Sequence, residues 1–170
     1  PMLEQLLDDP STRPIALLDA AVNPALLDRL YEVPGLSFDC FAEGETDAER
    51  FHSSPFAVDL TGQPELLAWL ERGWGRSWGV YGTTRLSLDQ LVRRLRPLTV
   101  ARMPERALAE FRFHDPRVLR AALPVLEPAQ QRALLDPFSG LVCEALRPDR
   151  ALRFAWSDAG LVRDAVPFGH

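Results

Sequence analysis

The sequence predicts an α/β domain, with α+β as the alternative, built on a mixed β-sheet of about six to eight strands with flanking helices. Strand-like and helix-like runs alternate in the first half of the chain, and pairs of strand-like runs flank turns in the second half. The 170 residues are 46% hydrophobic, which is enough for one core. We therefore expect a single compact domain over residues 1–170.

The first half reads as strands separated by helices and a polar loop. Apolar strand runs are expected at 14–22, 37–42, 56–60 and 77–82. Asn23-Pro24 opens a helix that ends by Pro34-Gly35, with inward side chains expected at Leu26, Leu27, Leu30 and Tyr31. Gln63-Pro64 opens a second helix, which stops near Gly73.

The second half begins with the clearest helix signal, over residues 87–96. Ser87 and Gln90 have the spacing of a capping box, apolar residues follow with helical periodicity, and Pro97 closes the helix. Hairpins are expected around Pro104-Glu105 and Pro148-Asp149, and the latter belongs to a C-terminal hairpin and tail over 146–170. Short helices are expected near 116–123 and 128–135 between these hairpins.

The stretch "FRFHDPRVLR", residues 111–120, holds the strongest local signal. Phe111 and Phe113 alternate with polar residues as in a half-buried strand. Asp115 is a favoured helix N-cap, and Pro116 suits the first helical position. We interpret the stretch as a strand that runs into a capped helix, with His114 at the joint. Adjacent side chains on an extended backbone point apart, so a catalytic pair of His114 and Asp115 is not expected.

Composition excludes several kinds of site. All 19 basic residues are arginine and the net charge is −5, so lysine-dependent phosphate or Schiff-base chemistry is excluded. The rarity of lysine, isoleucine and asparagine indicates a GC-rich, bacterial genome. Cys40 and Cys143 lie in apolar runs and are interpreted as reduced core thiols, with a disulfide or a catalytic thiol as the alternative. No spacing indicates a metal site. No apolar run could span a membrane, and no signal peptide is evident, so a soluble, cytoplasmic protein is expected.

The run "FRFHDPRVLRAALPVLEPAQQRALLDPFSGL" resembles the signature segment of the type VI secretion effector adaptor (chaperone) family. "IALLDAA", "CFAEGE", "PFAVDL" and "WGVYGTTRLSLDQLVRRLRPLTV" agree in order, so the resemblance covers roughly residues 14–145. The residues that carry the motif are Phe111, Arg112, Phe113, His114, Asp115, Pro116 and Arg117, and we interpret them as structural.

The resemblance implies a non-catalytic adaptor in the bacterial cytoplasm. Family members bind a toxic effector and help load it onto the valine-glycine-repeat spike protein, and they need no cofactor. The resemblance therefore implies two protein partners. We expect no nucleic-acid or membrane partner, and a monomer when the protein is free.

Two alternatives come from the residues themselves. "GRSWG", residues 75–79, fits the serine hydrolase pattern G-x-S-x-G, and His114 and His170 follow Ser77 in the chain. However, the predicted helix precedes this serine and the strand follows it, which reverses the order of a nucleophile elbow. A small nucleic-acid-binding domain is disfavoured by the acidic net charge and by the absence of a recognised motif.

Candidate partner-binding residues come from three features. Trp74 lies between two glycines, where it is either an exposed binding hot spot or part of the core. A basic patch is expected on and near the 87–96 helix, and an acidic loop precedes the third strand, either solvated or in contact with a partner. The candidates from the patch and the loop are Arg85, Arg93, Arg94, Arg96, Glu43 and Glu45.

Overall fold

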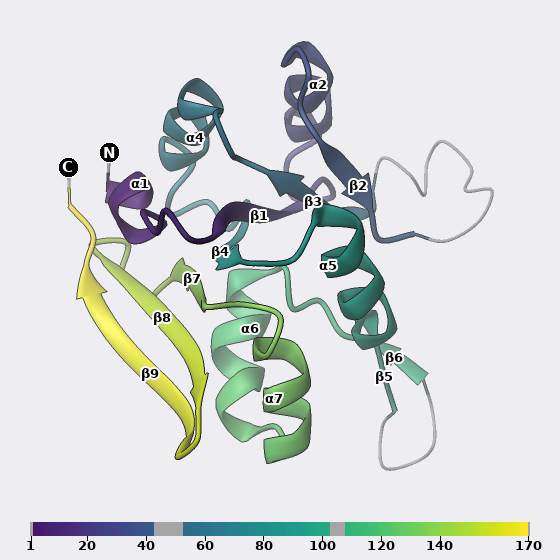
Figure 1. The fold of residues 1–170 in the computed structure, drawn as a ribbon, viewed down its shortest axis with the longest axis vertical. Coiled ribbons are helices and arrows are strands. Elements are labelled where there is room, and N and C mark those ends of the chain that lie inside the picture. The colour runs from purple at the N-terminus through teal and green to yellow at the C-terminus, as the bar shows by residue number, and fades with distance from the viewer. Residues whose placement is uncertain (1, 43–52, 103–107, 170) are drawn as a thin grey trace.

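The computed structural model describes residues 2–42, 53–102 and 108–169. Seven strands form one sheet in the order β2-β3-β1-β4-β7-β8-β9, and β5 and β6 form a separate hairpin (Figure 1). The predicted α/β class and the predicted number of strands are thereby confirmed. The strands are β1 (Arg13–Asp19), β2 (Phe38–Cys40), β3 (Pro55–Asp59), β4 (Gly79–Thr84), β5 (Val100–Arg102), β6 (Leu108–Glu110), β7 (Gly140–Glu144), β8 (Arg150–Ser157) and β9 (Gly160–Pro167).

The sequence predicted a mixed sheet, and the observed strand pairing corrects this prediction. Every pairing among the described strands is antiparallel. The strand–helix–strand unit β3–α4–β4 is present, but β1 lies between its two strands and pairs with both. The parallel strands of this unit are therefore separated by an antiparallel one, as in split β-α-β folds.

Helices cover both faces of the sheet (Figure 1). The apolar residues of β1 alternate between two core clusters, with Ala16 and Leu18 in one and Ile15 and Leu17 in the other. The first cluster takes its helical residues from α1, α2 and α4, and the second from α5, α6 and α7. The helices are α1 (Met2–Leu6), α2 (Ala25–Glu32), α4 (Pro64–Glu71), α5 (Leu88–Leu95), α6 (Pro116–Ala122) and α7 (Pro128–Leu135). In the described ranges, no helix has the length and apolar character that would let it cross a membrane.

Local capping signals in the sequence are confirmed. Ser87 accepts the backbone N–H of Gln90, and the Gln90 side chain accepts the backbone N–H of Ser87. Asp115 caps α6 by accepting the backbone N–H of Arg117 at 2.8 Å. Both helices therefore begin where the sequence indicates.

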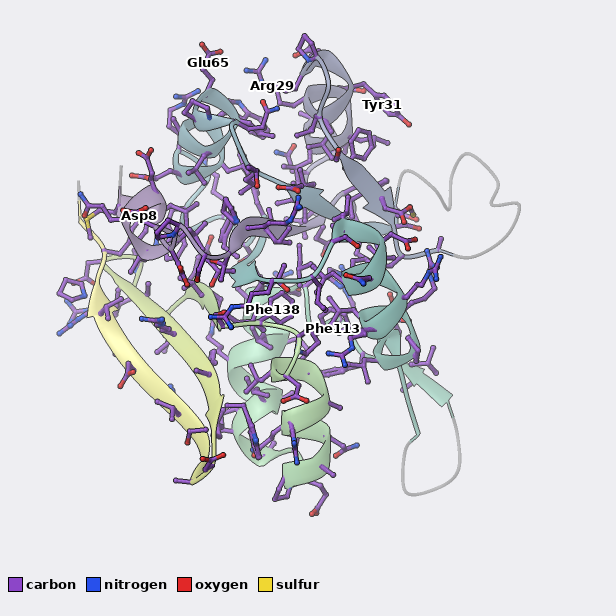
Figure 2. All side chains as sticks on the ribbon, viewed as in Figure 1. Asp8, Arg29, Tyr31, Glu65, Phe113 and Phe138 are labelled. Atoms are coloured by element: carbon purple, nitrogen blue, oxygen red, sulfur yellow. The ribbon has the colours of Figure 1, made fainter. Side chains whose placement is uncertain are left out.

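Three elements differ from the sequence predictions. Tyr31 was expected inside, but 64% of it is exposed, and its ring meets the edge of Phe38 instead (Figure 2). The strand expected to reach Phe113 ends at Glu110, because Phe113 and Asp115 donate their N–H groups to carbonyls two and three residues back and so bend the chain. The expected C-terminal tail contains β9, which pairs with β8 along its whole length.

We expect Phe113→Ala to lower the free energy of unfolding by about 3–5 kcal/mol, since the ring is fully buried against Phe41 and Phe111. Tyr31→Ala is the matched control, because it removes an aromatic ring that is mostly exposed. Urea denaturation of both variants checks the difference. An equal loss for the two variants would show that the Phe113 ring is not part of the core.

Candidate functional site

The signature segment crosses the end of β1, where it meets a fully buried carboxylate. Asp19 is the last residue of β1 and has no exposed surface. One carboxylate oxygen accepts the backbone N–H of Ala21 at 3.0 Å, and the other accepts a hydrogen bond from the Arg112 guanidinium. A buried carboxylate is costly unless it is paired, so Asp19 requires Arg112 at this position.

His114 lies in the same buried cluster. Its Nε2 atom is 3.8 Å from the Asp19 carboxylate, and its Nδ1 atom has no hydrogen-bond partner among the residues that the structure describes. Burial lowers the pKa of His114 to about 4, against the opposing effect of Asp19, so the imidazole is neutral near pH 7. The His114 imidazole is neutral and buried, and the Asp19 carboxylate beside it already accepts hydrogen bonds from Ala21 and Arg112. His114 therefore contributes packing in this arrangement.

Asp115 belongs to a separate ion pair, which faces outward from the start of α6. Its carboxylate accepts hydrogen bonds from both Nε and Nη2 of Arg117, at 3.0 and 2.8 Å. Hydrogen bonds from Arg117 lower the pKa of Asp115 in spite of its burial. Pro116 is buried at the first turn of α6. The predicted capped helix after His114 is confirmed, but a turn precedes it in place of the predicted strand, and His114 and Asp115 do not form a pair.

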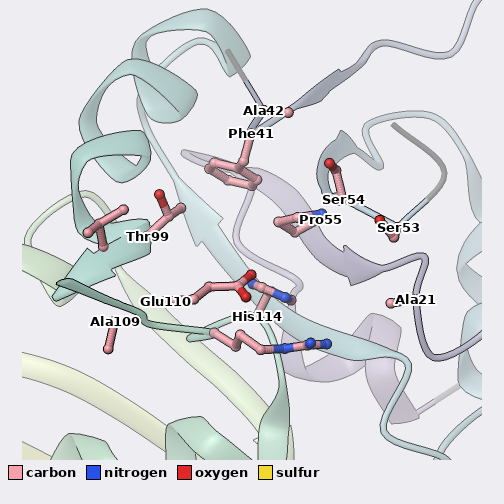
Figure 3. Close-up of a pocket in the computed structure, with 12 residues that line it drawn as sticks. Ala21, Phe41, Ala42, Ser53, Ser54, Pro55, Thr99, Ala109, Glu110 and His114 are labelled. Atoms are coloured by element: carbon pink, nitrogen blue, oxygen red, sulfur yellow. The ribbon is translucent and has the colours of Figure 1, made fainter. Parts of the chain in front are cut away.

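A pocket of about 600 Å³ opens beside this cluster. Figure 3 shows that the side chains of Phe41, Glu110 and His114 converge on it. Its lining combines one aromatic ring, hydroxyl groups including that of Thr99, a carboxylate and the Arg112 guanidinium. Arg112 also donates to Asp19, so part of its charge is compensated within the fold.

The "GRSWG" loop wraps around a second buried carboxylate. Ser77 has a positive φ of 57°, and its backbone N–H donates to both oxygens of Glu144 at 3.1 Å. Burial raises the pKa of Glu144, and backbone N–H groups of Gly75, Ser77 and Arg76 oppose this effect. A nucleophile elbow would offer such N–H groups to an oxyanion. Here Glu144 already occupies them. His170 lies outside the described residues, and His114 faces Asp19.

Trp74 contacts residues from the C-terminal part of the chain. Its ring stacks on Phe168 with centroids 3.8 Å apart, and its indole N–H donates to the carbonyl of Pro148 at 3.0 Å. The residue is half-buried, so part of its surface still reaches solvent. Its role as a contact for a partner stays a prediction, and its role in packing is visible.

The predicted basic patch separates into free and occupied arginines. Arg85 and Arg94 are exposed, and Arg93 is exposed but pairs with Asp89 at 3.1 Å. Arg96 turns inward and donates to the carbonyls of Cys40 and Phe41, at 3.0 and 3.2 Å. Arg96 therefore holds β2 against α5. Glu43 and Glu45 of the predicted acidic loop lie outside the described residues.

The two cysteines are the remaining candidates for a reactive group. Cys40 and Cys143 are free, and burial raises the pKa of the Cys143 thiol to about 12, so it stays protonated. Within the described part of the chain, no cluster of potential metal ligands forms. Sequence reasoning missed Asp19 and Glu144. The signal that could have found them is an acidic residue at the end of each strongly apolar strand run, "IALLD" and "GLVCE".

We expect His114 to make stability depend on pH. The folded pKa is about 4 and the unfolded value is 6.5, so protons bind the unfolded state more tightly. Stability is complete above pH 6.5 and falls by about 3 kcal/mol as the pH drops to 4. In His114→Gln this contribution is absent. Urea denaturation across that range measures the wild-type value minus the variant value, which cancels the titration of Asp115 and Glu144. A difference that does not change with pH would contradict a neutral, buried His114.

Comparison with known proteins assigns this sequence to a family. The sequence profile described as "Domain of unknown function (DUF4123)" matches residues 16–133, which includes the Asp19 cluster and the start of α6. No curated protein and no solved structure matches the chain. The match covers more than half of the chain and includes residues 111–133 of the signature segment, and the chain therefore belongs to the DUF4123 family of domains of unknown function.

Proposed function

We propose that this protein is a non-catalytic adaptor that binds a type VI secretion effector in the bacterial cytoplasm and helps load it onto the valine-glycine-repeat spike protein. The observation that carries the proposal is the family match, which includes residues 111–133 of the signature segment whose sequence resembles the adaptor family. An adaptor needs a stable scaffold and exposed surfaces, and it needs no reactive centre.

The chemistry of the signature segment supports a scaffold role. Its charged groups meet other groups of the same chain: Arg112 meets Asp19, and Asp115 meets Arg117. His114 is buried and uncharged near neutral pH. Polar residues that are used inside the fold are not available to a substrate, which favours a structural motif over a catalytic one.

We expect a partner to bind the exposed surface of helix α5 and of the residues just before it. Arg85, Arg93 and Arg94 give this region positive charge on a chain whose net charge is −5. A small basic surface on an acidic protein favours an acidic partner surface, because complementary charges speed encounter and select among partners. A nucleic-acid partner is less favoured, because the chain as a whole has a net charge of −5 and repels phosphate.

We expect the protein to co-purify with the effector and the spike protein encoded beside its gene. Each partner is co-expressed with the tagged chain, alone and together, and complexes are detected by size-exclusion chromatography. Failure of both partners to bind would refute the adaptor role.

A charge-reversal pair tests the surface within the same experiment. Arg93→Glu should weaken the complex, whereas Arg147→Glu should not. Arg147 is the matched control because both side chains are about equally exposed, at 74% and 79%, and each pairs with an aspartate. Equal effects of the two substitutions would remove α5 from the interface and leave the adaptor role intact.

We expect Ser77 to stay unlabelled by a fluorophosphonate probe. Its backbone N–H is engaged by Glu144, and no histidine among the described residues forms a hydrogen bond with its hydroxyl, so the serine is a weak nucleophile. Labelling of the wild-type protein that disappears in Ser77→Ala would establish the hydrolase alternative. Labelling that persists in Ser77→Ala would point to a different residue.

A further inference from the structure

Strand β9 forms one edge of the seven-stranded sheet. It pairs with β8 along all 8 of its residues, and it has no second neighbour among the described strands. Figure 1 shows β9 along the outside of the molecule. Residues 162–165 are exposed, so both faces of the middle of this strand reach solvent. A long row of backbone N–H and C=O groups is therefore left without a strand partner.

The register of the β8–β9 hairpin decides which backbone groups face outward. Phe168, directly after β9, donates its N–H to the carbonyl of Asp149, directly before β8, at 2.8 Å. In an antiparallel pair, only every second residue exchanges hydrogen bonds with the residue opposite. The register therefore directs the even-numbered residues of β9 towards β8, and it directs the N–H and C=O groups of Leu161, Arg163 and Ala165 towards the open edge.

This open edge fits an extended backbone. Its donors and acceptors recur at every second residue, roughly 6.8 Å apart, which is the repeat of another β-strand. A helix uses its own backbone groups internally, so it cannot bond to this row. Partner proteins bind such edges by adding a strand, with main-chain hydrogen bonds for affinity and alternate side chains for specificity.

One charge at the edge is unmatched within the hairpin. Arg163 lies opposite Phe154 of β8, whereas the neighbouring Asp164 lies opposite Arg153. Arg163 and Asp164 are both exposed, and they point to opposite faces of the sheet. Opposite charges on adjacent strands stabilise a sheet, so the edge favours an added strand with an acidic side chain opposite Arg163.

The same two charges disfavour a second copy of β9 as the added strand. Only odd-numbered residues of β9 can exchange hydrogen bonds across the open edge, so odd residues must lie opposite odd residues in an antiparallel pair of two copies. The two longest registers that meet this condition place Arg163 opposite Arg163 or Asp164 opposite Asp164. Like charges that lie directly opposite each other destabilise a sheet.

We propose that β9 binds an extended segment of a partner protein as an added strand of the sheet, with an acidic side chain of that segment opposite Arg163. The inference rests on the proposed function, since it assigns the open edge to one of the two partners of the adaptor.

Hydrogen exchange of individual backbone amides tests the added strand directly. The probes are the effector and the spike protein encoded beside the gene, each added separately. In the free protein, the amides of Leu161, Arg163 and Ala165 should exchange rapidly, and the even-numbered amides between them should be protected. One of the two partners should slow the exchange of the three outward amides by more than about tenfold, because acceptors of the added strand then hold these hydrogens.

Two substitutions at Ala165 test the backbone of the edge. Ala165→Pro removes one outward N–H, and proline is tolerated on the open side of an edge strand. Ala165→Val is the matched control, since valine has a similar size and keeps the N–H. Titration calorimetry should show that Ala165→Pro weakens binding by about tenfold, because an acceptor of the partner loses its hydrogen bond. Ala165→Val should bind like the wild type, and both variants should keep the wild-type melting temperature.

Two substitutions at Arg163 test the charge without altering the backbone. Arg163→Glu should weaken binding, because it places two acidic side chains opposite each other, and Arg163→Lys should restore it. These variants and the exchange measurement decide the question if Ala165→Pro lowers the melting temperature.

Two outcomes would overturn the edge assignment. In the first, a partner binds but the three outward amides exchange equally fast in the free and the bound protein, which leaves the adaptor role standing. In the second, these amides become protected in the free protein as its concentration rises, which makes the occupant a second copy. If neither the effector nor the spike protein binds, the proposed function fails and this inference fails with it.

Discussion

The burial of the Asp19 carboxylate constrains the rest of this fold. A charged group with no exposed surface is tolerated only with a partner, and the partner is Arg112, which is 93 residues later in the chain. This pairing places the signature segment across the end of β1. Two turns then bend the chain from β6 towards Asp115, which starts α6 over one face of the sheet. One ion pair therefore fixes where the β5–β6 hairpin and α6 lie.

A second buried carboxylate repeats this arrangement two strands away. β1 and β7 both pair antiparallel with β4 and therefore run in the same direction. Their last residues, Asp19 and Glu144, lie where these two strands end, on the same side of the sheet. Glu144 is held by backbone N–H of the loop before β4, and Arg120 of α6 donates to the Glu144 carbonyl at 3.3 Å. Arg120 of α6 thus contacts the chain at the end of β7, next to the Glu144 carboxylate. The charged residues of the signature segment are therefore explained by the charged groups that they contact within the protein.

The limits of sequence reasoning follow from the range of each interaction. Signals within one turn of chain identified the starts of α5 and α6, because Ser87 and Asp115 cap with groups two or three residues away. The insertion of β1 between β3 and β4 leaves no local pattern, so a mixed sheet was predicted in place of an antiparallel one. The contact between Ser77 and Glu144 spans 67 residues, so "GRSWG" resembled a catalytic motif although its serine supports a carboxylate. Trp74 was ambiguous for the same reason, since Phe168 and Pro148 are distant in sequence.

Two exposed surfaces, one basic and one apolar, are connected by a single segment of the chain. The chain leaves α5 through a 3-10 turn, Arg96–Thr99, and Leu98 in that turn lines an apolar groove between α7 and the β5–β6 hairpin. The exposed arginines of α5 lie just before this turn, and Arg96 anchors it to the carbonyls of Cys40 and Phe41. A protein that engages two partners needs two surfaces whose relative position is fixed. Here the half-buried Arg96 bonds to the last residue of β2 and to the residue after it. The basic surface and the groove therefore keep a fixed relative position, next to the core in which Phe41 packs against Phe113.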